Sequence, residues 1–194
     1  MNKFDEEKCE KAVRLLIESF GEDVNREGLI ETPRRVVKYW KELLEGNKYT
    51  NVEIANMYDK KFTVPSDALV VKEVKNVFSH CEHHLALMYN MTVTVAYIPK
   101  EVEGGYQVIG LSKIPRIVNL CAKRLQLQER LARDISECLS MATGSKSVYV
   151  NIKADHACVS ARGAKSDGFT DVTSLTGLFR TNSDLRKEVE MKVK

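Results

Sequence analysis

Residues 147–163 read SVYVNIKADHACVSARG, and this stretch decides how the chain is interpreted. Apolar residues from Val148 to Ile152 alternate with polar or aromatic ones, the period-2 pattern of a strand with one covered face. If the alternation continues, His156 and Cys158 point to that same face. A buried imidazole and thiol need partners, because an unsatisfied buried polar group costs about 1 to 3 kcal/mol. The stretch therefore predicts a strand that carries two polar side chains inward.

Further strands are predicted on the N-terminal side of this one. Residues 68–78 (ALVVKEVKNVF) and 91–99 (MTVTVAYIP) are rich in β-branched residues, which favour strands. A turn at residues 103–105 is expected to join 91–99 to 106–111 (YQVIGL) as a hairpin with a longer loop.

Helical periodicity surrounds these strands. Residues 5–20 form an amphipathic helix ended by Gly21, with the apolar stripe Cys9, Ala12, Val13, Leu16 and Phe20. A second helix has Thr32 as N-cap, Pro33 at its first position and Gly46 after its last turn, with Val36, Val37, Trp40, Leu43 and Leu44 inward. Residues 113–142 indicate two helices broken near residues 125–127. The element order predicts an α+β fold with a largely antiparallel sheet, residues 1–60 forming an N-terminal helical region and 61–194 the main region.

Composition excludes several classes of protein. The 194 residues are 43% hydrophobic and 29% charged, which is ordinary for a globular chain, and the net charge of +3 is too small to indicate nucleic acid or an acidic membrane as partner. No apolar run approaches the roughly 20 residues of a membrane helix, so a cytoplasmic protein is expected. Five cysteines are too few and too scattered for a disulfide scaffold.

All four histidines lie within a few residues of Cys81 or Cys158. Cys81 and His84 have C-x-x-H spacing, so one turn brings both to one ion, and thiolate with imidazole favours Zn²⁺. With Cys158 they predict a zinc site whose fourth position is left to water, as in catalytic sites. A structural site remains an alternative, closed by His80, His83 or His156. Cys9, Cys121 and Cys138 lie at helical core spacing and are interpreted as buried thiols.

Charged and polar residues elsewhere are candidates for binding a phosphate group and a purine base. Ser112, Lys113 and Arg116 open a helix after a strand, where free amide groups attract phosphate, and Arg162 follows Cys158 by four residues. The alternative is that these cations are solvated surface charges, which is the commoner case for isolated examples. Glu129 either pairs with Arg130 or accepts two N–H donors from a purine edge.

These residues form a series of motifs in sequence order. The chain carries ETPRRVVK (31–38), CEHH (81–84), VAYIP (95–99), VIGLSK (108–113), QLQERL (126–131), HAC (156–158), ARG (161–163) and GLFR (177–180). Together they closely resemble the GTP cyclohydrolase I family, from about residue 24 to residue 180.

The resemblance implies a fold and a reaction. The fold is the tunnelling fold, an antiparallel sheet with helices on one side, which several subunits join into a barrel. The expected assembly is a homodecamer with active sites between subunits, and residues 61–194 are the expected catalytic region. The reaction is the zinc-dependent hydrolysis and rearrangement of GTP to 7,8-dihydroneopterin triphosphate and formate, the first step of tetrahydrofolate and pterin biosynthesis.

The resemblance also assigns roles to matched residues. It implies that Cys81, His84 and Cys158 hold zinc and that His83 protonates the imidazole ring of GTP. It places His156 and Ser112 near the ribose, and Gln128 and Glu129 on guanine. The triphosphate is expected to meet Lys113, Arg116 and Arg162, with Arg35 and Lys38 from another subunit.

Other readings of the sequence predict different features. A zinc deaminase would carry H-x-E and P-C-x-x-C, and a nucleic-acid binder would interleave aromatics with a basic face; the sequence has neither. Another tunnelling-fold purine or pterin enzyme and a non-catalytic zinc-stabilised nucleotide-binding module are the remaining alternatives. The chain departs from the family in a longer segment at 100–107 and in lacking a glycine before VAYIP, changes expected to affect hairpin geometry or subunit contacts.

Overall fold

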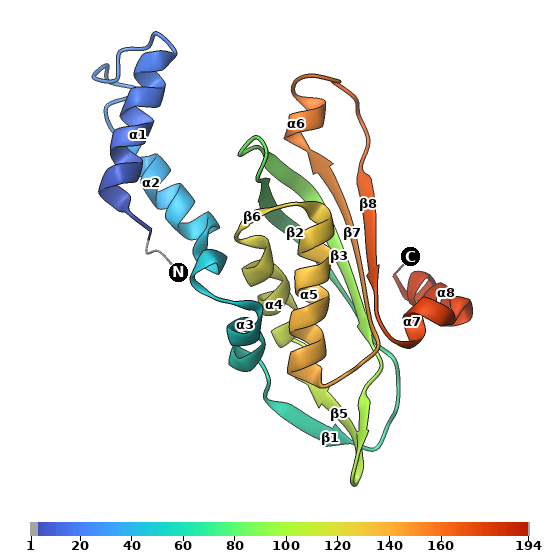
Figure 1. The fold of residues 1–194 in the computed structure, drawn as a ribbon. Helices are drawn as coiled ribbons and strands as arrows, with labels where there is room; N and C mark the ends of the chain where they lie inside the picture. Colours follow the sequence, from blue (N-terminus) through green and yellow to red (C-terminus); the bar gives the residue numbers. More distant parts are fainter. Residues whose placement is uncertain (1–3, 194) are drawn as a thin grey trace. The chain divides into compact units, whose positions relative to one another are not determined.

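The computed structural model describes residues 4–193 and separates into two units, one ending at Lys48 and the other beginning at Tyr49. Each unit is built from the elements drawn in Figure 1. Among the described residues no helix has the length and apolar character needed to cross a membrane.

The N-terminal unit contains α1 (Glu6–Ser19), α2 (Thr32–Leu43) and the 3-10 turn η1 (Glu45–Lys48). The helix predicted at 5–20 is confirmed, with the Asp5 carboxylate accepting the amide hydrogen of Lys8 at 2.9 Å as the N-cap. The predicted apolar stripe is wrong in part: Ile17 is the buried residue, whereas Leu16 and Phe20 are 53% and 70% exposed. Since α1 packs against α2 in this unit, only a narrow stripe is covered.

The second helix begins and ends earlier than its sequence signals suggested. Thr32 is its first residue, not its N-cap, and the capping position is Glu31. Pro33 is therefore second, where its missing amide hydrogen still costs nothing. The helix ends at Leu43 and Gly46 lies inside η1, because the chain tightens into a 3-10 turn before leaving the unit.

The second unit is organised around a five-stranded sheet in the order β6-β2-β3-β7-β8. Its strands are β2 (Val70–Cys81), β3 (Leu87–Tyr97), β6 (Leu125–Gln126), β7 (Val148–His156) and β8 (Thr170–Leu175). Every pairing is antiparallel except β2 with β6. Two helices, α4 (Lys113–Ala122) and α5 (Gln128–Thr143), cover one face of this sheet (Figure 1). The predicted α+β class, the largely antiparallel sheet and the helix break near residue 125 are confirmed.

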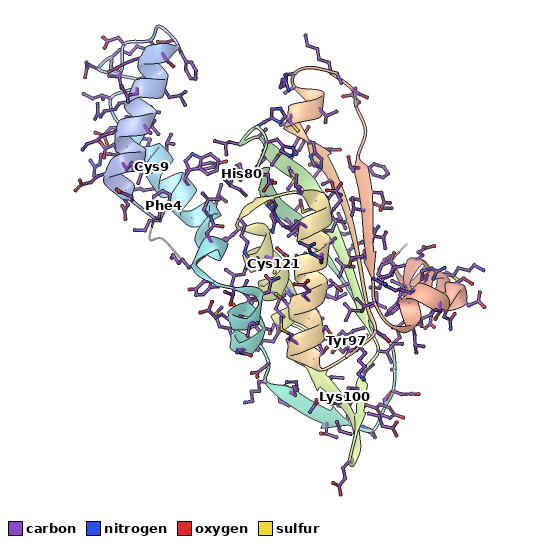
Figure 2. All side chains as sticks on the ribbon, viewed as in Figure 1. Phe4, Cys9, His80, Tyr97, Lys100 and Cys121 are labelled. Carbon is purple, nitrogen blue, oxygen red and sulfur yellow. The ribbon has the colours of Figure 1, made fainter. Side chains whose placement is uncertain are left out.

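Alternation along the strands supplies the core. Val93, Val95, Val150 and Ile152 are fully buried and belong to one apolar cluster with residues of α4 and α5. Burying a side chain of this size contributes roughly 1.5 to 3 kcal/mol, so these strands anchor the sheet to its helices. Cys121 of α4, labelled in Figure 2, lies with its sulfur 3.6 Å from that of Cys138 on α5. Both thiols are fully buried, as predicted, whereas Cys9, which was also predicted to be buried, is only half-buried.

A second sheet of three strands, in the order β1-β5-β4, corrects the predicted hairpin. It consists of β1 (Lys61–Val64), β4 (Lys100–Val102) and β5 (Gly105–Ile109). The strand at 106–111 pairs with β4 and β1 instead of with β3, because the chain leaves the large sheet at Ile98-Pro99, where proline cannot donate to a ladder. The turn itself is where it was expected. Gly105 has φ +142°, and a Cβ there would collide with the carbonyl of Val64.

Short helices complete this unit: α3 (Asn51–Met57), α6 (Ala157–Ser160), α7 (Leu178–Thr181) and α8 (Ser183–Lys192). A capping box between Thr50 and Glu53 starts α3, and α6 follows β7 directly. This last junction shapes the candidate site.

Candidate functional site

Two thiols and one imidazole from distant parts of the chain meet at one end of the large sheet. The ligand atoms of Cys81, His84 and Cys158 all lie within 4.8 Å of one another. Ligands of a tetrahedral zinc ion lie about 3.5 to 3.8 Å apart, given Zn–S near 2.3 Å and Zn–N near 2.0 Å. Small side-chain movements therefore suffice for the three to hold one ion, and the donor set suits zinc.

Local structure explains how Cys81 and His84 are brought together. Cys81 ends β2, and its amide donates to the carbonyl of Ala86 at 2.8 Å, closing a tight turn toward β3. Leu85 completes this turn with φ +53°, in the left-handed region. The C-x-x-H spacing thus sits on a turn, as the sequence predicted.

Cys158 reaches the group by a different route from the one predicted. The strand ends at His156, and Cys158 belongs to α6, so it does not continue the alternation of β7. The amide of Ala161 donates to the carbonyl of Ala157 at 3.0 Å, which makes a helical turn in place of extended chain. This turn carries the thiol toward Cys81.

The Cys81 sulfur affects the ionisation of the Cys158 thiol. Burial raises the pKa of the Cys158 thiol, and the neighbouring Cys81 raises it further, whereas Arg162 acts in the opposite direction. A bound cation reverses this balance, because a coordinating thiol loses its proton.

Arg162 lies beside the candidate ligands. Its Nη1 is 3.2 Å from Nε2 of His84, which places a cation expected to bind phosphate next to the metal-binding group. His83 is exposed on the same turn, with its ring centroid 6.3 Å from that of His84. His80, by contrast, is 2% exposed, and burial lowers the pKa of its imidazole.

His156 is held by the first residue of α5. Its Nε2 lies 2.7 Å from Oε1 of Gln128, whose side chain is only 2% exposed. Burial lowers the pKa of His156, and the carboxylates of Glu129 and Asp155 partly offset this effect.

An ion pair missed by the sequence reasoning joins the metal-binding turn to α5. Nη2 of Arg130 is 2.5 Å from Oε2 of Glu82 and 2.6 Å from the carbonyl oxygen of Leu125. Arg130 is thus turned toward Glu82 and not toward Glu129, which resolves the pairing left open above; successive helical residues do not face each other. The hydrogen bond from Arg130 lowers the pKa of Glu82. Because 48 residues separate Glu82 from Arg130, no local sequence pattern signals this pair.

The other predicted residues lie on helix starts. Ser112 is the N-cap residue of α4, and its exposed hydroxyl makes no capping hydrogen bond. Lys113 is half-buried, with Nζ 5.8 Å from the ring centroid of Tyr58, and Arg116 is exposed. Arg35 and Lys38 are exposed on α2 in the N-terminal unit.

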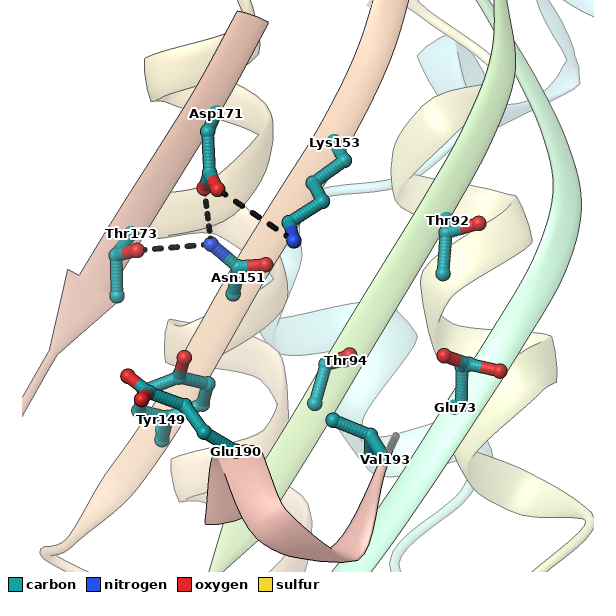
Figure 3. Close-up of a pocket in the computed structure, with 10 residues that line it drawn as sticks. All are labelled: Glu73, Thr92, Thr94, Tyr149, Asn151, Lys153, Asp171, Thr173, Glu190 and Val193. Atoms are coloured by element: carbon teal, nitrogen blue, oxygen red, sulfur yellow. Dashed lines mark hydrogen bonds and ion pairs between the residues drawn. The ribbon is translucent and has the colours of Figure 1, made fainter. Parts of the chain in front are cut away.

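A separate hollow lies on the sheet face opposite α4 and α5 (Figure 3). Its volume is about 600 Å³, and its described lining is mostly polar. Asn151 donates to the hydroxyl of Thr173 at 2.9 Å and also to Asp171, and Lys153 lies 3.8 Å from Asp171. No predicted site residue belongs to the described residues that line this hollow. Since the predicted site residues lie elsewhere and three of them converge at one end of the sheet, the candidate site is that end and not this hollow.

Comparison with known proteins gives the family. The family described as GTP cyclohydrolase I matches residues 9–194. GTP cyclohydrolase 1 of Clostridium beijerinckii is 45% identical over 194 residues, covering 96% of this chain and 95% of that protein. GTP cyclohydrolase 1 of Clostridium acetobutylicum is 44% identical over 188 residues, covering 93% of each chain. Among solved structures, an archaeosine synthase QueF-Like in the apo form aligns with 58% of this chain and 96% of its own, with a TM-score of 0.46 and 22% identity. The match to the family over nearly the whole chain, at these identities, means that the chain belongs to the GTP cyclohydrolase I family of enzymes.

Proposed function

We propose that this protein hydrolyses and rearranges GTP to 7,8-dihydroneopterin triphosphate and formate, using zinc held by Cys81, His84 and Cys158. One observation carries the zinc part of the proposal: the three ligand atoms lie within 4.8 Å of one another although Cys158 is more than 70 residues from the others. The donor set supports zinc as the ion, since thiolate and imidazole are the ligands that Zn²⁺ takes in proteins. When bound, zinc supplies Lewis acidity that makes hydroxide available near neutral pH.

In this proposal, different histidines of the site carry out different proton transfers. His83, exposed beside the metal-binding turn, donates a proton to the imidazole ring of guanine. His156 acts near the ribose as the ring opens and the product rearranges. Ser112 is the proposed partner of the ribose and phosphates, and its exposed hydroxyl has no capping bond to break.

Guanine and the triphosphate are bound by opposite charges. The Glu129 carboxylate, exposed at the start of α5 and not engaged by Arg130, would accept from N1–H and the 2-amino group, which adenine does not offer. Lys113, Arg116 and Arg162 would bind the triphosphate, as guanidinium and ammonium groups suit phosphate oxygens. Arg35 and Lys38 join them from another subunit.

The assembly that this requires is a homo-oligomer, proposed to be a decamer in which sheets join across subunits into a barrel. Residues 61–194 would form the catalytic region and residues 1–60 the helical one. In support, β8 is an edge strand of the sheet among the described residues, and the sheet face away from the helices is polar around its 600 Å³ hollow.

The test is direct. Purified protein loaded with zinc is incubated with GTP, and formate and the fluorescence of the oxidised pterin are measured. We expect both products from the wild-type protein, and for Glu129→Ala a raised KM for GTP with zinc retained. Zinc-loaded protein that binds GTP without releasing formate would replace the proposal by a non-catalytic nucleotide-binding module.

A further inference from the structure

Gln128 is the least exposed of the residues expected to bind substrate. It is the first residue of α5, and its side chain is 2% exposed. Its Nε2 donates to two main-chain carbonyl oxygens, that of Ile152 on β7 at 2.8 Å and that of Thr170 on β8 at 3.0 Å. Both hydrogens of the amide are therefore used within the chain.

These two bonds determine which way the amide faces. A carbonyl oxygen only accepts, so the alternative orientation would set Oε1 of Gln128 against two acceptors and leave Nε2 facing His156. A buried acceptor without a donor is costly, and the alternative orientation would leave the carbonyl oxygens of both Ile152 and Thr170 without this donor. Oε1 is consequently fixed at its position 2.7 Å from Nε2 of His156.

The orientation of Gln128 in turn determines the hydrogen on His156. Because Oε1 accepts and cannot donate, Nε2 of His156 must carry a hydrogen. A neutral imidazole carries only one, so Nδ1 is the nitrogen left with a free lone pair. Nδ1 of His156 is therefore the ring nitrogen that can accept a proton.

We propose that Gln128 is a positioning residue, which fixes the ring orientation and the Nε2–H tautomer of His156, and that it does not read guanine. The inference rests on the proposed function for what His156 does, and it deepens that function by leaving base selectivity to Glu129.

Kinetics separate positioning from base reading. We expect Gln128→Met, which keeps the length of the side chain and removes its hydrogen bonds, to lower kcat about 100-fold, within the usual range for a displaced acid–base group. KM for GTP and the preference for GTP over inosine triphosphate, which lacks the 2-amino group, should stay unchanged. Glu129→Gln is the matched variant and should show the reverse, a raised KM and a weaker preference. A Gln128→Met enzyme with normal kcat, or with raised KM and altered preference, would overturn the proposal.

A spectroscopic measurement tests the tautomer without relying on activity or on the folding of a variant at position 128. Nitrogen-15 solid-state NMR of histidine-labelled, zinc-loaded wild-type protein at about pH 8.5, where an ordinary imidazole is neutral, should show the His156 hydrogen on Nε2. The signal is assigned by its loss in His156→Asn. A hydrogen on Nδ1 would contradict the inference. Wild-type protein that releases no formate would defeat the proposed function and leave the tautomer result standing, so the two failures are distinguishable.

Discussion

At the scale of single residues, Cys158 is the proposed zinc ligand that lies farthest along the chain from the other two. It comes from α6 to join Cys81 and His84. We expect Cys158→Ser to lose zinc together with activity, because a hydroxyl is a poor ligand for zinc compared with a thiolate. The affinity for zinc should fall more than about 100-fold, which exceeds the usual loss when a residue that only hydrogen-bonds to a metal ligand is changed. Zinc per chain is measured by mass spectrometry after dialysis, with Cys9→Ser on α1 as control. A Cys158→Ser protein that keeps one zinc per chain would show that the group is not the metal site.

A substitution at His83 tests whether the proposed catalytic step and the proposed metal binding are separable within one turn. Its ring is exposed and was not among the three converging ligands. We expect His83→Ala to keep zinc while kcat falls about 10²- to 10⁴-fold, the usual contribution of a general acid. Zinc content and formate release are measured on the same preparation. If the substitution released the metal, His83 would be a ligand and the proposed division of roles would be wrong.

These residues also show what sequence can predict at this scale. Cys81 and His84 were predicted from spacing alone, because four successive residues on a turn must lie near one another. Cys158 was assigned to the right group by an argument that the structure corrects, since alternation stops at His156. Glu82 and Arg130 were not anticipated as a pair, because an ion pair across 48 residues leaves no local pattern.

At the scale of elements, the short strand β6 is held between α4 and α5 by a partly enclosed polar network. Oδ2 of Asp134 accepts from Arg124 at 3.1 Å and from Gln126 at 3.0 Å, and Oδ1 accepts from Asn51 at 3.3 Å. The side chains of Arg124 and Asp134 are 15% and 10% exposed. This network aligns the strand that runs beside Cys81.

We expect Asp134→Ala to lower the free energy of unfolding by about 2 to 4 kcal/mol, because it removes the carboxylate that pairs with Arg124 and accepts from Gln126. Urea unfolding is measured at fixed protein and zinc concentrations, since bound metal and association both shift apparent stability. The control is Glu188→Ala, which breaks an exposed pair with Lys192 on α8 and should change stability by less than about 0.5 kcal/mol. Equal effects of the two variants would contradict the role given to the network.

The positions of the strands were predicted better than the pairing of one strand with another. Periodicity identified the strands around 91–99 and 106–111, yet it predicted that they pair, and the structure assigns them to different sheets. The pairing depends on where the chain turns at Pro99 and on β1, whose residues 61–64 were not predicted as a strand. Local patterns report the exposure of each side chain and carry no information about the neighbouring strand.

At the scale of the whole molecule, the proposed site needs two chains. Arg35 and Lys38 lie on α2, in the unit that ends at Lys48, while the metal-binding residues lie in the other unit. Sequence resemblance supplies the expectation that these cations serve another subunit, and no pattern within one chain can establish it. Complementation between inactive variants can.

We expect Cys158→Ser and the double variant Arg35→Ala/Lys38→Ala to be inactive separately at low GTP concentration, the first lacking metal and the second lacking cations for the triphosphate. When the two are co-expressed in equal amounts, about a quarter of the sites should combine an intact metal group with intact cations from a neighbouring subunit, if subunits mix at random in a symmetric oligomer. Formate release should then recover to about that fraction of the wild-type rate. Co-expression of Cys81→Ser with Cys158→Ser is the control and should recover nothing, because both changes damage the same metal group and neither chain keeps it whole. Mixed oligomers, verified by native mass spectrometry, that remain inactive in the first pairing would show that Arg35 and Lys38 do not act across subunits.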